Sequence, residues 1–199
     1  MNRSVYRNLL RIVGIVLALV GVGAVIGGTF AHSSVTDQLQ KEAITMPTQD
    51  KVTSLPQESQ DALESFFGKE MTTGPAAKAF ADDYIWNHIQ SSCTSVKTAD
   101  GTAIEAVPED QCSFAGVGDV ATANKSDDAK YTAYTALRAT IFQGESLRGM
   151  LLTAYAFWTV GTVALVAGYA LIGIGAIMTI VGFAGFRGGN QKSGVQAAE

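Results

Sequence analysis

Histidine and cysteine are scarce in this sequence: its 199 residues include two of each. Two histidines cannot furnish a catalytic network without help from other groups, and neither His32 nor His88 lies at a metal-ligand spacing. The sequence also lacks a G-x-S-x-G, a phosphate-binding loop and a C-x-x-C motif. We therefore expect a protein that is not an enzyme, with no catalytic residue, no metal site and no cofactor.

Charge is absent from two long segments. Residues 150–186 form a run of thirty-seven uncharged residues, and residues 12–30 form a run of nineteen. A helix needs about 20 apolar residues to cross the hydrocarbon core of a bilayer, so each run is long enough to span it. Because neither run contains an ionisable side chain, the sequence gives no sign of a proton relay or an ion path.

The remaining charges are unevenly distributed. Seventeen of the 18 Asp and Glu residues lie between His32 and Gly149 with nine Lys and Arg, so this segment has a formal charge of −8. The other basic residues flank the two apolar runs: Arg3, Arg7, Arg11, Arg187 and Lys192. Since Lys and Arg near membrane spans stay on the cytoplasmic side, we expect a multi-pass plasma-membrane protein with both termini cytoplasmic. The acidic middle segment argues against a nucleic-acid partner.

This pattern predicts the following organisation: a cytoplasmic N-terminus at 1–11, a first transmembrane helix at 12–30, an extracytoplasmic helical domain at 31–149, a long helix at 150–186 and a cytoplasmic tail at 187–199. The long helix enters the bilayer near Tyr155, Phe157 and Trp158, an aromatic belt, and its span covers about 159–186. Two alternatives stay open. The first run can be a cleaved signal peptide, although signal h-regions usually have about 7–15 residues. A turn inside the second run would give three spans and place Arg187 outside.

Helical periodicity predicts a mainly α outer domain. One helix is expected after Pro56, another begins at a Thr73 cap, and a third begins near Asp127 and leads into the last span. The second helix has apolar residues three and four apart, which predicts a buried face: Ala77, Phe80, Ala81, Tyr84, Ile85, His88 and Ile89. Residues 116–128 are predicted to be a loop, and Asp82-Asp83 is predicted to be a helix-start or solvated charge pair.

Both cysteines lie in the predicted outer domain and enclose 18 residues. In an oxidising compartment an isolated pair is most simply a disulfide, so we predict a Cys93–Cys112 bond; two free thiols are the alternative. Between the cysteines, Asp100-Gly101 is flanked by partly alternating residues, which is the signal of a two-residue hairpin turn. The bond would clip this hairpin to the preceding helix.

Glycine recurs every seven residues in both apolar runs: Gly14, Gly21 and Gly28 in the first, and Gly161, Gly168, Gly175 and Gly182 in the second. Seven residues are nearly two helical turns, so each series marks one stripe along a helix. Small residues let transmembrane helices approach closely, and we predict that the stripes are helix-packing surfaces. The pattern leaves open whether they contact each other or a partner, and transmembrane helices are rich in Gly in any case.

The junction before the second span is predicted to contact a partner through Glu145, Arg148 and Trp158. Glu145 and Arg148 are three residues apart and therefore neighbours on a helix. An exposed pair contributes about 0–1 kcal/mol, whereas a pair covered by a partner is desolvated and costly to break. The alternative is that the pair only stabilises a helix weakened by Gly144 and Gly149.

Two segments carry a resemblance to a known group of proteins. "QGESLRGMLLTAYAF" resembles the "QGE-x-LRG-x-LL-x-AYAF" junction of small actinobacterial membrane proteins with two spans and an outer helical segment, and "GPAAKAFADDYIWNHI" is similar to their "GP-x-x-A-x-x-x-AD-x-I" segment. Such proteins are often labelled aromatic ring-opening dioxygenases. A non-haem iron site of that kind needs two His and a carboxylate, which this chain does not plausibly supply, so we do not expect that activity.

Composition, periodicity and resemblance together predict a mainly α membrane protein: two transmembrane helices and a mostly helical extracytoplasmic domain with a disulfide-clipped hairpin. The expected function is that of a non-enzymatic structural or accessory subunit of an envelope complex. Proteins of this general type occur in the actinobacterial cytochrome bc–oxidase respiratory supercomplex, which implies integral membrane partners, including haem-containing subunits, besides the bilayer. The alternative is an extracytoplasmic ligand-binding or sensor module anchored by the two spans.

Overall fold

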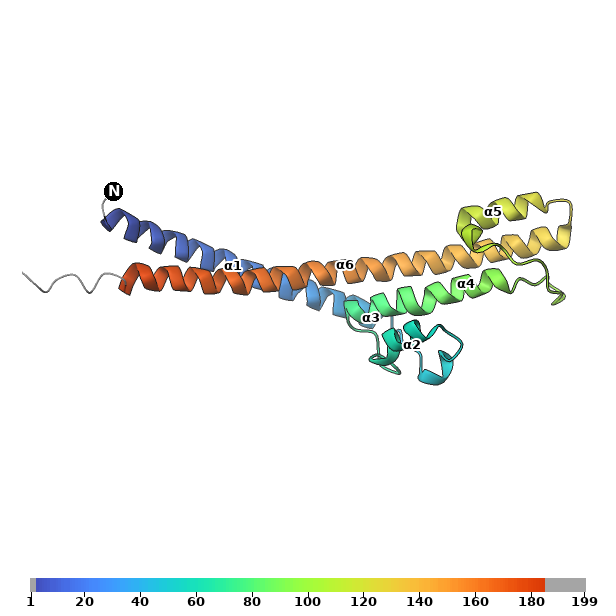
Figure 1. Ribbon diagram of the computed structural model, residues 1–199, viewed down its shortest axis with the longest axis horizontal. Helices are drawn as coiled ribbons and strands as arrows, with labels where there is room; N and C mark the ends of the chain where they lie inside the picture. Colours follow the sequence, from blue (N-terminus) through green and yellow to red (C-terminus); the bar gives the residue numbers. More distant parts are fainter. Residues whose placement is uncertain (1–2, 185–199) are drawn as a thin grey trace, which may run out of the picture. The chain divides into compact units, whose positions relative to one another are not determined.

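The computed structural model describes residues 3–184, which are mostly helical. In this part of the chain there is no strand, and the β-type pairing consists of the isolated bridges Thr45–Glu70 and Lys97–Ala103. The elements follow one another in this order: α1 (Arg3–Lys41), the 3-10 turn η1 (Gln49–Lys51), α2 (Gln57–Glu64), α3 (Gly74–Ala79), the π-helix η2 (Phe80–Ile85), α4 (Trp86–Thr94), the 3-10 turn η3 (Glu109–Gln111), α5 (Phe114–Ala123) and α6 (Asp128–Ala184). The α-helices are labelled in Figure 1.

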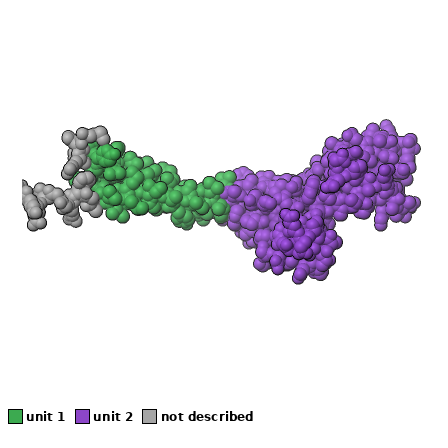
Figure 2. Space-filling model, viewed as in Figure 1, with its two compact units in different colours: residues 1–32, 160–199 green, residues 33–159 purple. Residues whose placement is uncertain are grey.

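The chain divides into two compact units, coloured separately in Figure 2. Unit 1 contains Met1–His32 and Val160–Glu199, and unit 2 contains Ser33–Thr159. The predicted cytoplasmic tail at 187–199 lies outside the described residues.

Unit 1 consists of the first part of α1 and the last part of α6. Both helices are long and apolar enough to cross a membrane. Their outward side chains are large and apolar, and Leu19, Ile26 and Val166 are each 66% exposed. Such exposure is costly in water and suits lipid.

The remainder of α1 belongs to unit 2 and ends there at a defined stop. Val35 and Leu39 are buried in the unit 2 core, so the helix continues past the apolar run that the sequence marks. It ends after Lys41, where Ala43 adopts a left-handed conformation with φ of 48° and its N–H donates to the Gln40 carbonyl. This arrangement satisfies one of the free carbonyls of the last turn.

The core of unit 2 is formed where α2, the helical segment 74–94 and the first part of α6 meet. Its most deeply buried side chains come from loops as well as helices: Met46, Val52, Leu63, Met71, Val117, Tyr134 and Ile141. The expected helix starts are confirmed, because the Thr73 hydroxyl accepts from the Ala76 N–H and the Asp127 carboxylate accepts from the Lys130 N–H. The expected shared face of Tyr134, Leu137 and Ile141 on α6 is buried.

Residues 74–94 form one helical rod that contains the π-helix η2. Five of its buried positions are four residues apart: Ala77, Ala81, Ile85, Ile89 and Cys93. In an α-helix of 3.6 residues per turn, a four-residue spacing drifts around the axis. A wider π turn compensates for that drift, so we attribute the π-helix to the need to keep these five side chains on the core.

Two predictions about the outer domain are wrong in detail. Residues 116–128 were expected to be a loop, but most of them belong to α5. Ser113 caps that helix by accepting from the Gly116 N–H, and Val117 and Ala121 are buried. His88, expected on the buried face, is exposed, and its Nδ1 lies 2.8 Å from the Tyr84 carbonyl oxygen. The four-residue spacing of the buried face places it at the edge instead.

The hairpin between the cysteines has a longer turn than predicted. Only Gly101, with φ of 87°, has a positive φ there, whereas a two-residue type I′ turn needs two such residues. The Thr98 N–H donates to the Thr102 carbonyl, so the loop contains the three residues Ala99, Asp100 and Gly101. A single bridge, Lys97–Ala103, follows the turn.

Candidate interaction surfaces

The glycine stripes of unit 1 face each other. A Cβ built on Gly14 would lie 2.8 Å from the Gly175 carbonyl oxygen. The same construction on Gly21 approaches the Gly168 carbonyl at 2.7 Å, and on Gly28 the Gly161 carbonyl at 2.6 Å. Real Cβ atoms are not found at such distances, so α1 and α6 pack here backbone to backbone. Seven-residue spacing on both helices brings the same pairing back every two turns.

Other glycines in the same helices lack such a contact. A Cβ on Gly23, Gly27 or Gly173 would meet no atom within 4 Å. The Gly23–Gly27 pair therefore faces away from α6, and the stripe that contacts α6 is Gly14, Gly21 and Gly28.

At the end of the stripe nearest the N-terminus of α1, Gly182 makes room for an arginine. A Cβ there would lie 2.7 Å from Arg11 Cγ. Arg11 Nε donates to the Gly182 carbonyl at 2.9 Å, and its guanidinium lies 4.0 Å from the centroid of the Phe183 ring. A cation bonded to a carbonyl in the last turn of α6 is also favoured by the helix dipole.

In unit 2, Arg148 pairs with Asp82 and not with Glu145 as the sequence predicted. Arg148 Nη2 donates to Asp82 Oδ1 at 2.8 Å, and Lys78 Nζ donates to Asp82 Oδ2 at 2.8 Å. The Arg148 guanidinium also lies 5.1 Å from the Trp86 ring. The spacing of Glu145 and Arg148 allows a local pair, but Asp82 is reached across the helix interface and binds two cations.

Asp82 and Asp83 are adjacent but lie in different surroundings. Asp83 Oδ1 accepts from the Ser59 hydroxyl at 3.2 Å, and Asn87 Nδ2 donates to the same hydroxyl at 3.0 Å. Neighbouring residues on a helix point in different directions, so one carboxylate faces α6 and the other α2. The expected solvated charge pair is therefore wrong.

These surroundings shift the pKa values of the two carboxyls in opposite directions. For Asp82, burial raises the pKa, but hydrogen bonds from Lys78 and Arg148 outweigh burial and bring the pKa below its ordinary value of 3.8. For Asp83, burial is the largest influence and raises the pKa above 3.8, with the Ser59 hydrogen bond acting against it. The ionised form of Asp82 is therefore stabilised in the fold, whereas burial disfavours the ionised form of Asp83.

Trp158, expected at a partner interface, packs inside unit 2. It is half-buried against the core, and a Cβ on Gly74 would collide with its Cβ and Cγ. Gly74 is thus required where the α3 N-terminus meets α6. Of the three predicted interface residues, Arg148 and Trp158 therefore have partners within unit 2.

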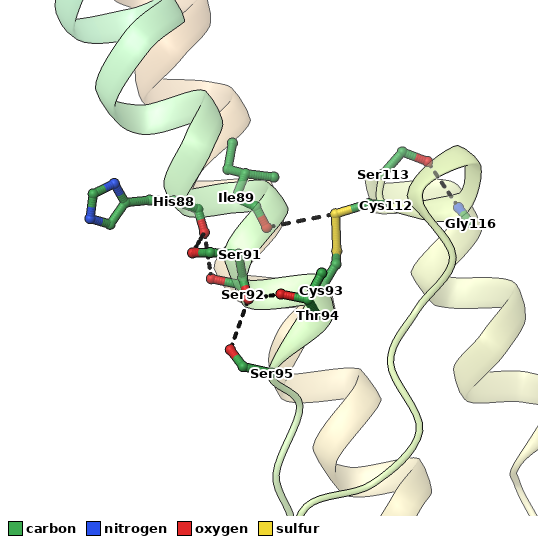
Figure 3. The surroundings of a disulfide bond; sticks show 10 residues. All are labelled: His88, Ile89, Ser91, Ser92, Cys93, Thr94, Ser95, Cys112, Ser113 and Gly116. Atoms are coloured by element: carbon green, nitrogen blue, oxygen red, sulfur yellow. Dashed lines mark hydrogen bonds between the residues drawn. A yellow bond between two sulfur atoms is a disulfide. The ribbon is translucent and has the colours of Figure 1, made fainter. Parts of the chain in front are cut away.

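The predicted disulfide is present (Figure 3). Cys93 and Cys112 are bonded, with their Cα atoms 5.9 Å apart, and the bond joins the end of α4 to the segment before α5. Cys112 Sγ lies 3.6 Å from the Ile89 carbonyl oxygen; a disulfide sulfur carries no proton, so this is a contact and not a hydrogen bond. Both residues are buried, at 1% and 4% exposure.

A shallow apolar groove lies between the helical rod and α6 in unit 2. One wall is a ladder of three rings, Phe80, Tyr84 and His88, whose successive centroids are 4.9 and 4.2 Å apart. The other wall contains Ile141, Gly144 and Leu147, and the cavity measures about 280 Å³. A Cβ on Gly144 would lie 2.9 Å from Ile89 Cδ1, so this glycine permits the close approach of the two helices.

One face of α6 in unit 2 exposes large apolar side chains. Phe142, Met150 and Phe157 are 56%, 69% and 61% exposed. At 100° per residue they lie within about 80° of one another around the helix. Between them, a Cβ on Gly149 would meet no atom within 4 Å. We call Phe142, Gly149, Met150 and Phe157 the outer face.

Sequence comparison adds one finding. A family described as proteins of unknown function (DUF3185) matches residues 11–55, which is less than a quarter of the chain and covers most of α1 and the segment after it. No curated protein and no solved structure matches the chain.

Proposed function

We propose that this chain is a non-enzymatic accessory subunit of a larger complex in the plasma membrane. In this proposal both spans are retained, both termini are cytoplasmic, and unit 2 is extracytoplasmic. The respiratory cytochrome bc–oxidase supercomplex is the proposed complex, supported by the resemblance of the 143–157 junction to small actinobacterial membrane proteins. Its integral membrane subunits, including haem proteins, would be the partners.

The outer face of α6 carries the proposal. Surface helices normally present polar residues to water, and exposed apolar patches mark protein or membrane contacts. Phe157 belongs to the expected aromatic belt, so the bilayer accounts for its exposure. Phe142 lies fifteen residues earlier, roughly 22 Å along the helix at 1.5 Å per residue. A lipid contact at Phe157 leaves Phe142 and Met150 in need of a protein surface.

The glycine stripes support the choice of this face. They hold α1 against α6, so they are occupied within the chain and are not available to a partner. A partner subunit would instead approach α6 from the side of Met150, where Gly149 allows close contact.

Co-purification in mild detergent followed by mass spectrometry tests the proposal. We expect wild-type protein to retain membrane partners in stoichiometric amount, and Met150→Glu to lose them, because a buried unpaired carboxylate is costly. Ala99→Glu is the control: Ala99 is also exposed in unit 2, but it lies in the hairpin loop and not on α6. Retention of every partner by Met150→Glu, or purification of the wild type as a lone monomer, would contradict the proposal.

The apolar groove favours a second candidate, an anchored ligand-binding module. Its ring ladder and apolar opposite wall suit a small hydrophobic ligand. Thr140→Phe would fill the groove with a larger side chain without touching the outer face. A ligand that co-purifies with wild type and not with this variant, in protein that has no partner, would favour this candidate.

A further inference from the structure

Arg11, near the N-terminal end of α1 in unit 1, is held in one orientation. Arg11 donates its Nε–H to the Gly182 carbonyl and places one face of its guanidinium on the Phe183 ring. A guanidinium has five N–H donors in a planar fork, and these contacts use only one of them. The donors on the two terminal nitrogens make no hydrogen bond to a described residue and remain for another acceptor.

A second arginine lies one turn earlier on the same side of α1. A Cβ built on Gly182 would approach Arg11 Cγ and would also lie 3.4 Å from the Arg7 carbonyl oxygen. Arg7 Nε is buried and has no hydrogen-bond partner among the described residues. A buried donor without an acceptor indicates a missing group.

The described part of unit 1 contains no counter-ion for these cations. Its residues, 3–32 and 160–184, include Arg3, Arg7 and Arg11 and no Asp or Glu. The anion that neutralises them must therefore come from outside these segments.

The position of the pair along α1 indicates which anion that is. The uncharged run begins at Ile12, immediately after Arg11, so in an inserted helix both guanidinium groups lie at headgroup depth. We propose that Arg7 and Arg11 bind the phosphate of an anionic phospholipid in the leaflet where α1 begins. The phosphodiester presents two oxygens to the guanidinium fork. The inference rests on membrane insertion, which belongs to the proposed function, but not on a protein partner.

A zwitterionic lipid fits this site less well. Its headgroup carries a cation beside the phosphate, and two arginines without a carboxylate repel that cation. Juxtamembrane basic residues favour anionic lipids by electrostatic attraction. An anionic headgroup such as phosphatidylglycerol neutralises the site without adding a positive charge.

Native mass spectrometry of the full-length protein tests the proposal. The protein is equilibrated in detergent with equal amounts of phosphatidylglycerol and phosphatidylcholine that have identical acyl chains. We expect wild type to retain phosphatidylglycerol with a preference on the order of tenfold. Arg7→Gln and Arg11→Gln should each remove most of it. Arg11→Lys should also remove most of it, because a lysine keeps the charge but cannot donate to the Gly182 carbonyl and present two parallel donors to the phosphate at the same time.

Arg138 provides a matched control. In unit 2 it makes the same two interactions, an Nε donation of 3.1 Å to the Phe114 carbonyl and a distance of 4.0 Å from the Phe114 ring. Arg138→Gln should keep the full lipid preference.

Three results would overturn the proposal: equal retention of both lipids by wild type, an unchanged preference in Arg7→Gln, or displacement of phosphatidylglycerol by inorganic phosphate alone, which would indicate a soluble anion. Arg7→Gln decides the outcome if Arg11→Gln loosens the helix pair, since Arg7 Nε has no partner to lose within residues 3–184. Met150→Glu should leave lipid retention intact, so failure of the partner proposal is recognisable separately.

Discussion

At the scale of single residues, Asp82 and Asp83 contribute to stability with opposite signs. The pKa of Asp82 lies below 3.8 because hydrogen bonds from Lys78 and Arg148 outweigh the effect of burial. Its stabilising contribution is present above pH 3.8 and is lost as the pH falls through the lower pKa of the folded state. The pKa of Asp83 is raised by burial. Its penalty is present above that raised pKa and disappears as the pH falls to 3.8.

We therefore expect Asp82→Asn to destabilise the protein at pH 7 and Asp83→Asn to leave it unchanged or more stable. The Asp82 effect should be about 1 kcal/mol or less, since its pairs with Lys78 and Arg148 are partly exposed. In Asp83→Asn an amide oxygen can still accept from Ser59. Thermal unfolding in detergent at pH 7, followed by circular dichroism, measures both.

The pH dependence distinguishes charge from packing. Any gain from Asp83→Asn should vanish below pH 3.8, because wild-type Asp83 is then protonated in both the folded and the unfolded state. A loss of stability in Asp83→Asn of the same size at pH 7 and pH 3.5 would show that the amide disturbs the Ser59 contact, and the electrostatic explanation would be wrong.

Arg148 illustrates what sequence spacing can predict at this scale. Lys78 and Asp82 are four residues apart, so their ion pair can be anticipated from helical spacing alone. Asp82 and Arg148 are 66 residues apart, and their contact depends on how the helical rod packs against α6. Local spacing favoured Glu145 as the partner because it carries no information on that packing.

At the scale of elements, the glycines of α1 provide a pair of matched substitutions. Gly21 and Gly23 are two residues apart in the same helix, but only Gly21 faces α6. We expect Gly21→Ala to destabilise the helix pair by about 1–3 kcal/mol, because its Cβ would lie 2.7 Å from a backbone oxygen and overpacking is costly. Gly23→Ala should be neutral or slightly stabilising, because alanine has the higher helix propensity.

Thermal unfolding compares the stability of these variants, and spin labels at Val22 and Gly173, both exposed, report the separation of the two helices. Gly21→Ala should lengthen or broaden the measured distance distribution, whereas Gly23→Ala should not. Equal behaviour of the two variants would mean that the stripe does not set the spacing of α1 and α6.

The disulfide connects elements that are distant in the sequence. It joins positions separated by 19 residues, so the chain-entropy estimate predicts a loss of about 3 kcal/mol for Cys93→Ala with Cys112→Ala. Replacing both residues avoids leaving a buried thiol. Chemical denaturation of purified protein measures the change. Because both cysteines are buried, reductant should open the bond only as the protein unfolds; rapid alkylation of both without denaturant would contradict this.

Element boundaries were predictable where a capping residue or a proline marks them, as at Thr73 and Asp127. The helix α5 was not, because its sequence contains Gly116 and Gly118, which disfavour helices. In the fold, a Cβ on Gly118 would lie 3.0 Å from Arg138 Nε, so this glycine leaves room for Arg138 to pack against α5. Tertiary packing decides the structure there, and the same explanation applies to the π-helix. The hairpin turn differs by one residue because Asp100 does not adopt a positive φ.

At the scale of the whole molecule, the distribution of charge along the chain matches its division into two units. The described residues of unit 1 contain arginines and no carboxylate, whereas the segment from His32 to Gly149 has a formal charge of −8. Basic residues precede the first span and follow the second. Two spans are an even number of crossings, so both termini are expected on the same side of the membrane. Positive charge near membrane spans is retained in the cytoplasm, so unit 2 is expected on the other side.

Reporter cysteines test this topology in intact cells. The two native cysteines are bonded and buried, so they should not react. Ala99→Cys, exposed in the hairpin of unit 2, should be labelled by a membrane-impermeant maleimide. Asn8→Cys, exposed between Arg7 and Arg11, should be labelled only after the membrane is permeabilised. If the first run were a cleaved signal peptide, the Asn8→Cys label would be missing from the mature protein altogether. Labelling of Asn8→Cys in intact cells would reverse the orientation and remove the electrostatic basis for placing Arg7 and Arg11 in the cytoplasmic leaflet.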